Sequence, residues 1–175
     1  MFVNTLRTSA DSYGSTETAE NLARTVRAMH HTIKGVRPDG AAYDVAVADL
    51  DAKFFRASRK NLLDALLTQT PASVWTYRFD WKQEAAPWND VYGAAHAFDL
   101  PFVFGNFGPS VFAKATNSTA NQPGRLALSR AMMDSLRAFV HTGDPNNATL
   151  GQTWQPWPRK FIFDADQKAL RLSVQ

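Results

Sequence analysis

One histidine stands among small residues directly before a short apolar run, which is a setting that suits a reactive base. The segment reads Gly93-Ala-Ala-His96-Ala-Phe-Asp99-Leu-Pro-Phe-Val-Phe104-Gly105. An imidazole changes charge near neutral pH, and glycine and alanine neighbours let a reacting group come close, so His96 can serve as a general base. The alternative is a buried histidine bonded to the backbone, which is the commoner role of a lone histidine. The residues alone leave both interpretations open.

The clearest strand pattern in the chain precedes this histidine and would position it. Residues 74–81 alternate strictly, which predicts a strand with its aromatic side chains on one face. Those side chains are Trp75, Tyr77, Phe79 and Trp81. A loop over 82–89 then leads to His96. A strand, a loop and then a histidine is the order in which an α/β enzyme presents a base at the carboxyl end of its sheet.

Helical periodicity predicts elements that would cover such a sheet. One helix is expected from Ser15 or Thr16 to residue 33, a second within 51–68 and a third over 125–142. Gly143 is expected to end the third helix. The sequence therefore predicts an α/β fold class.

Two further segments are predicted from their turn residues. Residues 160–164 and 169–174 are typical of two strands joined as a terminal hairpin. Residues 106–123 are rich in glycine, serine, threonine, asparagine and proline, which predicts an irregular excursion over the surface.

Composition narrows the classes of protein. The chain has 175 residues, of which 45% are hydrophobic and 20% charged, which is typical of a soluble globular domain. The net charge is +3 and the basic residues are scattered, so we expect no nucleic-acid partner. The absence of cysteine excludes a thiol nucleophile and a zinc-thiolate site. No run reaches the ~18 apolar residues of a membrane span, and the start lacks the features of a signal peptide. The compartment stays open.

We expect no metal and no cofactor. The adjacent pair His30 and His31 would point about 100° apart on a helix, so the two rings cannot share a metal ion.

Three separated segments resemble the C-terminal part of the type B carboxylesterase/lipase family, the α/β-hydrolases that include the cholinesterases. They are the strand from Val74 to Asp80, the Gly93–Gly105 segment, and Phe139-x-x-Thr142-Gly-Asp-Pro-Asn146 followed by Trp154-Gln-Pro-Trp157-Pro. The match is best over 70–175. The resemblance implies a single partial domain over 1–175, with a few sheet strands covered by three or four helices.

The resemblance also implies a role for His96, as the general base of a Ser-His-Glu/Asp triad in a serine carboxylic-ester hydrolase. Other triad parts do not occur: no Gly-x-Ser-x-Gly surrounds Ser15 or Ser110, and Asp11 and Glu17 lack the Asp-Glu-Gly context of the family's acid. We therefore expect a C-terminal fragment that is inactive alone. Its expected partners are the missing N-terminal part of the same domain and, in the full-length parent, a small carboxylic ester.

Phe98, Trp88 and Trp81 are candidate residues of the acyl or alcohol pocket, and ordinary core packing is the alternative for each. A second function is also open, because neuroligin-like relatives keep the fold as binding or adhesion modules without a working nucleophile. A third possibility is a partial domain that folds independently and has no catalytic role.

Overall fold

A computed structural model describes residues 45, 48–49, 52–53, 57–69, 74–86, 88–110 and 113–175. Their helices are α4 (Ala57–Gln69), α5 (Trp88–Val91), α6 (Leu100–Val103), α7 (Ala113–Thr116), α8 (Gln122–Thr142) and the 3-10 turn η3 (Ala148–Leu150). Their strands are β1 (Tyr77–Phe79), β2 (Phe161–Phe163) and β3 (Ser173–Val174). The helix predicted within 51–68 is found as α4. The helix predicted up to residue 33, with the pair His30 and His31, lies outside the described residues.

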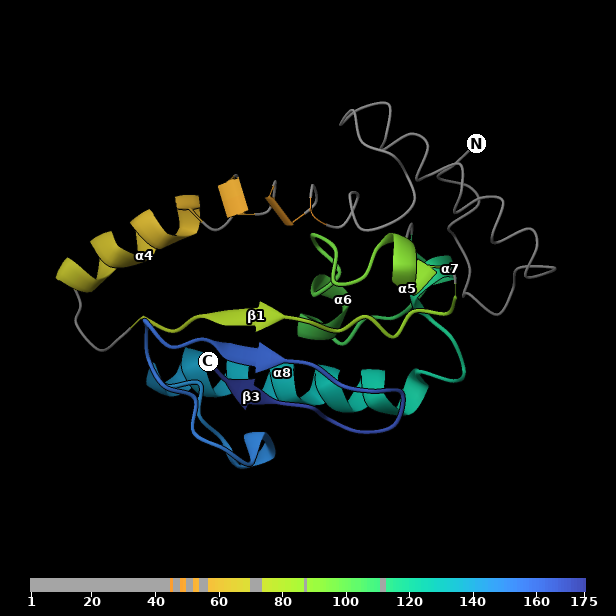
Figure 1. The fold of residues 1–175 in the computed structure, drawn as a ribbon. Helices are drawn as coiled ribbons and strands as arrows, with labels where there is room; N and C mark the ends of the chain where they lie inside the picture. The colour runs from red at the N-terminus through yellow and green to blue at the C-terminus, as the bar shows by residue number, and fades with distance from the viewer. Residues whose placement is uncertain are drawn as a thin grey trace.

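The described strands form one small mixed sheet in the order β1-β2-β3. Strand β1 is parallel to β2, with Tyr77 opposite Phe161, and β3 is antiparallel to β2, with Val174 opposite Phe161. The β2–β3 pair confirms the predicted terminal hairpin. Figure 1 shows the β1 and β2 arrows pointing toward the end of the molecule where α5, α6 and α7 gather. Residues that follow β1 therefore emerge at the carboxyl end of the parallel strands.

The predicted strand over 74–81 is wrong in extent, since β1 covers only Tyr77–Phe79. The flanking residues keep single backbone bonds: Val74 O accepts from Trp157 N at 2.8 Å, and Asp80 N donates to Phe163 O at 2.9 Å. The ladder is short because β2 is short, and Pro158 has no N–H to continue it.

Helix α8 is the main support of the sheet, and the helix predicted over 125–142 is confirmed with an earlier start. It begins at Gln122 with a proline in its first turn, and it ends at Gly143, whose φ of 77° places the C-cap in the left-handed region. Figure 1 shows α8 running alongside β2 and β3. The Ser129 hydroxyl donates to Phe102 O at 2.8 Å, which ties α6 to α8.

The core is rich in aromatic side chains, as the alternating pattern of the strand predicts. Trp81 packs on Phe102 with ring centroids 4.9 Å apart, and Phe79 packs on the same ring at 5.0 Å. Trp154 stacks on Phe161 at 5.0 Å. Such pairs each contribute about 0.5–1.5 kcal/mol beyond the area they bury. They join β1, β2 and α6 into one packed unit.

The surface excursion predicted over 106–123 is wrong for its second half. Helix α7 occupies Ala113–Thr116, and Thr116, Asn117, Ser118 and Asn121 are buried. The Asn117 side chain donates to Phe107 O at 2.9 Å, and that of Asn121 donates to Gln83 O and Thr116 O, both at 2.8 Å. The polar side chains that suggested an exposed loop instead donate hydrogen bonds to buried backbone carbonyl groups.

Candidate active site

His96 lies in the turn between α5 and α6, at the carboxyl end of β1 and β2. Two backbone bonds shape this turn: Ala95 N donates to Gly93 O at 2.8 Å, and Phe98 N donates to Ala95 O at 3.1 Å. Gly93 has a φ of 51°, a conformation that favours glycine. His96 is exposed, so the alternative of a buried histidine is wrong.

The residue after His96 adopts a strained backbone. Ala97 has a φ of 68°, and no other described non-glycine residue has a positive φ. A left-handed alanine costs about 1–2 kcal/mol and persists where the surroundings hold it in place. Here Phe98 is the anchor, since its side chain is only 3% exposed. The turn thus directs Phe98 into the core and leaves the neighbouring His96 at the surface.

A hydrogen bond between side chains fixes the far end of the turn. The Tyr77 hydroxyl, on β1, donates to Asp99 Oδ2 at 2.8 Å. Asp99 precedes α6 as its N-cap but makes no side-chain cap bond there, because its carboxylate bonds to Tyr77. Burial, the hydrogen bond and the Asp99 charge together raise the pKa of Tyr77, so the phenol stays a donor throughout the physiological range. Sequence reasoning identified Tyr77 only as one aromatic residue of a strand.

The predicted pocket residues Trp81, Trp88 and Phe98 are all buried. Trp88 stacks on Tyr92 with centroids 5.6 Å apart and ring planes 15° apart, and Phe98 packs on the same tyrosine at 5.5 Å. Trp81 belongs instead to the aromatic cluster of β1 and α6. The structure brings Phe98 and Trp88 together and leaves Trp81 in a separate cluster.

Within the described residues, no group of three or more His, Asp or Glu side chains is placed to hold a metal ion. No helix in that part of the chain combines the length and apolar character that crossing a membrane requires.

The fold and the site together define a class of protein. A parallel strand pair, a terminal antiparallel strand and a covering helix form part of an α/β fold. The family model described as the Carboxylesterase family matches residues 3–174. The chain belongs to this family.

Two relatives show the same kinship. The chain is 35% identical over 88 residues to the para-nitrobenzyl esterase of Bacillus subtilis, a match that covers 50% of this chain and 16% of the relative. It is 30% identical over 106 residues to the acetylcholinesterase of Gallus gallus, which covers 61% of this chain and 13% of the relative. The matched part is thus well under a fifth of either relative's length.

Solved structures agree on the fold. The Geobacillus stearothermophilus carboxylesterase Est55 superposes with a TM-score of 0.60 and 24% identity, covering 90% of this chain and 32% of that one. An esterase from Clostridium hathewayi gives a TM-score of 0.55 and 23% identity, covering 94% of this chain and 31% of that one. The α/β-hydrolase fold is therefore confirmed, and the chain spans about a third of the length of these neighbours.

Proposed function

We propose that this chain supplies the general-base histidine, His96, of a serine carboxylic-ester hydrolase, together with part of its substrate pocket. The observation that supports this most directly is the His96 turn. An exposed His96 is followed by a strained Ala97 and a buried Phe98, beyond the strand ends of a carboxylesterase-family fold. Strain concentrated beside one exposed titratable side chain is typical of a functional turn.

In the proposed reaction, a serine from another segment attacks the carbonyl carbon of an ester. His96 accepts the serine proton as the C–O bond forms, and returns that proton to the alkoxide as it leaves. Water then repeats the cycle to release the acid. A carboxylate from that other segment orients the ring. Asp99 is assigned a different task, because its carboxylate is already bonded to Tyr77: it fixes the turn that carries His96.

Phe98 is the proposed pocket residue nearest the chemistry, since it is two positions from His96 and its ring is buried at the base of the same turn. Trp88 contacts it through Tyr92 and would form the next layer of the pocket wall. Trp81 is the most remote of the three, since it packs on Phe102.

The open surfaces of the molecule support the proposal that residues 1–175 form a partial domain. The chain matches about a third or less of its structural neighbours. Large apolar side chains are exposed at the C-cap of α6 and on α8, where Phe104 is 71% and Val140 is 72% exposed. Leu136 and Phe139, which the helical pattern places on the apolar face of α8, are 44% and 42% exposed. Such patches mark surfaces that another segment covers.

The experiment is reconstitution. The 175-residue chain is co-expressed with a fragment of the Bacillus subtilis esterase that carries the residues preceding its aligned part, and hydrolysis of p-nitrophenyl acetate is measured. We expect activity from the pair and negligible activity from the chain alone. His96→Ala should lower the activity of the pair by about 10²–10⁴-fold. His141→Ala, at an exposed position on α8, is the matched control and should change it less than twofold.

Two outcomes would contradict the proposal. One is hydrolysis by the isolated chain that His96→Ala abolishes, which would place the nucleophile within these residues. The other is a complex that forms and folds but shows no dependence on His96. The second result would favour the alternative, an inactive binding module of the same fold.

A further inference from the structure

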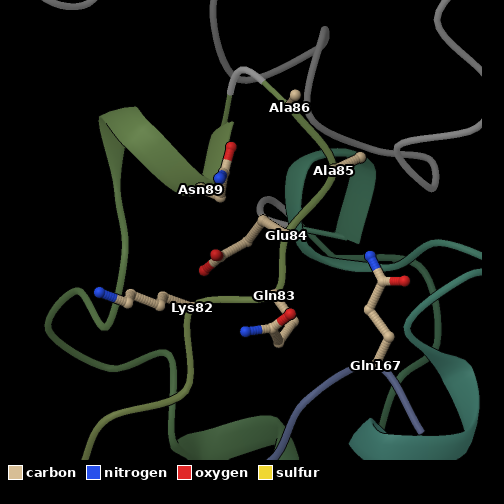
Figure 2. A pocket seen from close by; sticks show the side chains of 7 residues that line it. All are labelled: Lys82, Gln83, Glu84, Ala85, Ala86, Asn89 and Gln167. Atoms are coloured by element: carbon tan, nitrogen blue, oxygen red, sulfur yellow. The ribbon is translucent and has the colours of Figure 1, made fainter.

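A pocket of about 510 Å³ opens beside the His96 turn and involves none of the residues assigned above to the hydrolase site. The side chains that line it are shown in Figure 2: Lys82, Gln83, Glu84, Ala85, Ala86, Asn89 and Gln167. They come from the segment after β1, from α5 and from the turn between β2 and β3. The volume lies within the range of small-molecule sites.

The feature that points to a ligand is Glu84. Its side chain is only 4% exposed, and both carboxylate oxygens are buried without a hydrogen-bond partner among the described residues. In Figure 2 the carboxylate points toward the space between Lys82 and Asn89. A buried carboxylate normally has its lone pairs satisfied, because an unpaired one costs several kcal/mol. The pocket therefore presents an acceptor pair that lacks a donor.

Two walls of the pocket are fixed by the start of α8. The Asn121 side chain donates to Gln83 O at 2.8 Å, and Gly124 N donates to Gln167 O at 2.9 Å. The approach at Gly124 is so close that a Cβ atom there would lie 1.9 Å from Asp166 O. These buried bonds hold the backbone of Gln83 and Gln167 in place on two sides of the pocket.

The chemistry of the lining selects one class of ligand. An ionised carboxylate offers about four acceptor sites and a negative charge, and the Gln83 and Asn89 side chains add amide oxygens. Ca²⁺ and Mg²⁺ take six or more oxygen ligands, and among the described residues no group of three or more His, Cys, Asp or Glu side chains is placed to hold a metal ion. A primary ammonium group needs three acceptors and carries one positive charge. Its three N–H donors match in number the Glu84 carboxylate and the two amide oxygens, and its charge is opposite to that of the ionised Glu84 side chain.

We propose that this pocket binds a small primary amine, with its ammonium group on the Glu84 carboxylate and its remaining N–H groups on the side-chain oxygens of Gln83 and Asn89. This binding site is independent of the proposed hydrolase role, since it requires neither a nucleophilic serine nor His96.

The proposal carries a signature in pH. Burial raises the pKa of Glu84 to about 8, against a smaller opposite effect of its own backbone N–H. The ammonium binds the ionised form, so affinity should rise on the order of 50- to 100-fold between pH 6 and pH 8.5 and then level off. Lys82 is the other titratable residue of the lining.

The test is calorimetric titration of the 175-residue chain with n-butylammonium chloride at pH 6 and pH 8.5. We expect one saturable site with the stated pH dependence. Glu84→Gln should remove the binding, with circular dichroism confirming that the variant is folded. Lys168→Met, at an exposed lysine outside the lining, is the matched control and should leave binding unchanged. Tetramethylammonium, n-butanol and calcium chloride are the control ligands.

Several results would overturn the proposal. Equal binding of n-butanol would show an apolar site, and equal binding of tetramethylammonium would remove the role of N–H donors. Calcium binding that displaces n-butylammonium would make the pocket a metal site. Affinity for n-butylammonium that is unchanged between the two pH values would contradict Glu84 as the partner even if the Glu84→Gln variant failed to fold. Absence of binding at both pH values would contradict the proposal outright.

Discussion

The Tyr77 hydroxyl and the Asp99 carboxylate are 2.8 Å apart, although 22 positions separate them in the chain. This bond joins strand β1 to the turn that carries His96. The Tyr77 ring is in turn packed edge-on against Phe163 at 5.7 Å and Trp154 at 6.3 Å. The position of the histidine turn therefore depends on the sheet through a tyrosine that the core holds in place.

Removing this bond should loosen the turn without unfolding the protein. Tyr77→Phe keeps the packed ring and deletes the donor, so we expect a loss of about 1 kcal/mol in the free energy of unfolding. Amide hydrogen exchange of Phe98 and Leu100, which bond to Ala95 O and Ala97 O, should become faster. Urea denaturation and exchange measured by NMR provide the two readouts.

Tyr92→Phe is the matched control for that variant. Its hydroxyl is buried without a hydrogen-bond partner among the described residues, and burial raises its pKa to about 12. Deleting an unsatisfied hydroxyl should leave stability unchanged or improve it. If Tyr77→Phe and Tyr92→Phe behaved alike, the bond to Asp99 would not be what holds the turn.

The strain at Ala97 predicts a stabilising substitution. Glycine adopts a φ of 68° without the penalty of a Cβ atom, and this gain exceeds the extra entropy that glycine loses on folding. We expect Ala97→Gly to raise the free energy of unfolding by up to about 1 kcal/mol, measured by urea denaturation. Gly143→Ala is the reverse case, because it places a Cβ atom at a φ of 77° where the surrounding space is open. We expect it to lower the free energy of unfolding by about the amount that Ala97→Gly gains. A destabilised Ala97→Gly variant would mean that the turn is not strained.

Glu84 predicts how stability depends on pH. Its pKa is about 8 in the folded chain against an ordinary value of 4.5, so between these values the folded state holds a proton that the unfolded state has lost. The stability that this retained proton provides is complete below pH 4.5 and is lost as pH rises through 8. Over that interval the free energy of unfolding falls by up to about 1.4 kcal/mol per pH unit. Urea midpoints at pH 5 and pH 8 without added amine measure this loss.

Glu84→Gln should flatten that dependence, because the amide has no charge to bury. The variant should be more stable than the parent chain at pH 8 and closer to it at pH 5. A parent chain equally stable at both pH values would show that Glu84 is satisfied in solution. Lys82→Met serves as the control, since it alters a neighbouring charge at an exposed position and should keep the pH dependence of the parent.

The close approach at Gly124 predicts a severe packing defect. In Gly124→Ala the added methyl group would overlap Asp166 O, so the start of α8 must separate from the turn between β2 and β3. We expect a loss of about 3 kcal/mol in the free energy of unfolding, measured by thermal or urea denaturation. Gly151→Ala, at a φ of 63° with open space around it, should lose only about 1 kcal/mol. Equal effects would contradict the backbone contact.

Local patterns in the sequence determined the elements whose formation depends on near neighbours. Helix α8 and its stop at Gly143 follow from apolar spacing and a C-cap glycine, and the terminal hairpin follows from two short apolar segments and the turn between them. The Gly93–Gly105 segment also carried the family resemblance. Each of these patterns spans only a few neighbouring residues, so it can be recognised in one sequence without knowledge of the fold.

Tertiary packing decided the rest, because it depends on contacts between distant residues. The length of β1 was set by how far β2 runs beside it, and the burial of Asn117 and Asn121 was set by carbonyl groups at Phe107 and Gln83. The hydrogen bond between Tyr77 and Asp99 forms only in the folded chain. Gln167 lies beside the segment of Glu84 because the start of α8 bonds to the backbone of Gln167. The sequence by itself determined the family and which histidine to examine. The tertiary structure decided that this histidine is exposed and which carboxylate is buried, since burial is a property of the assembled core.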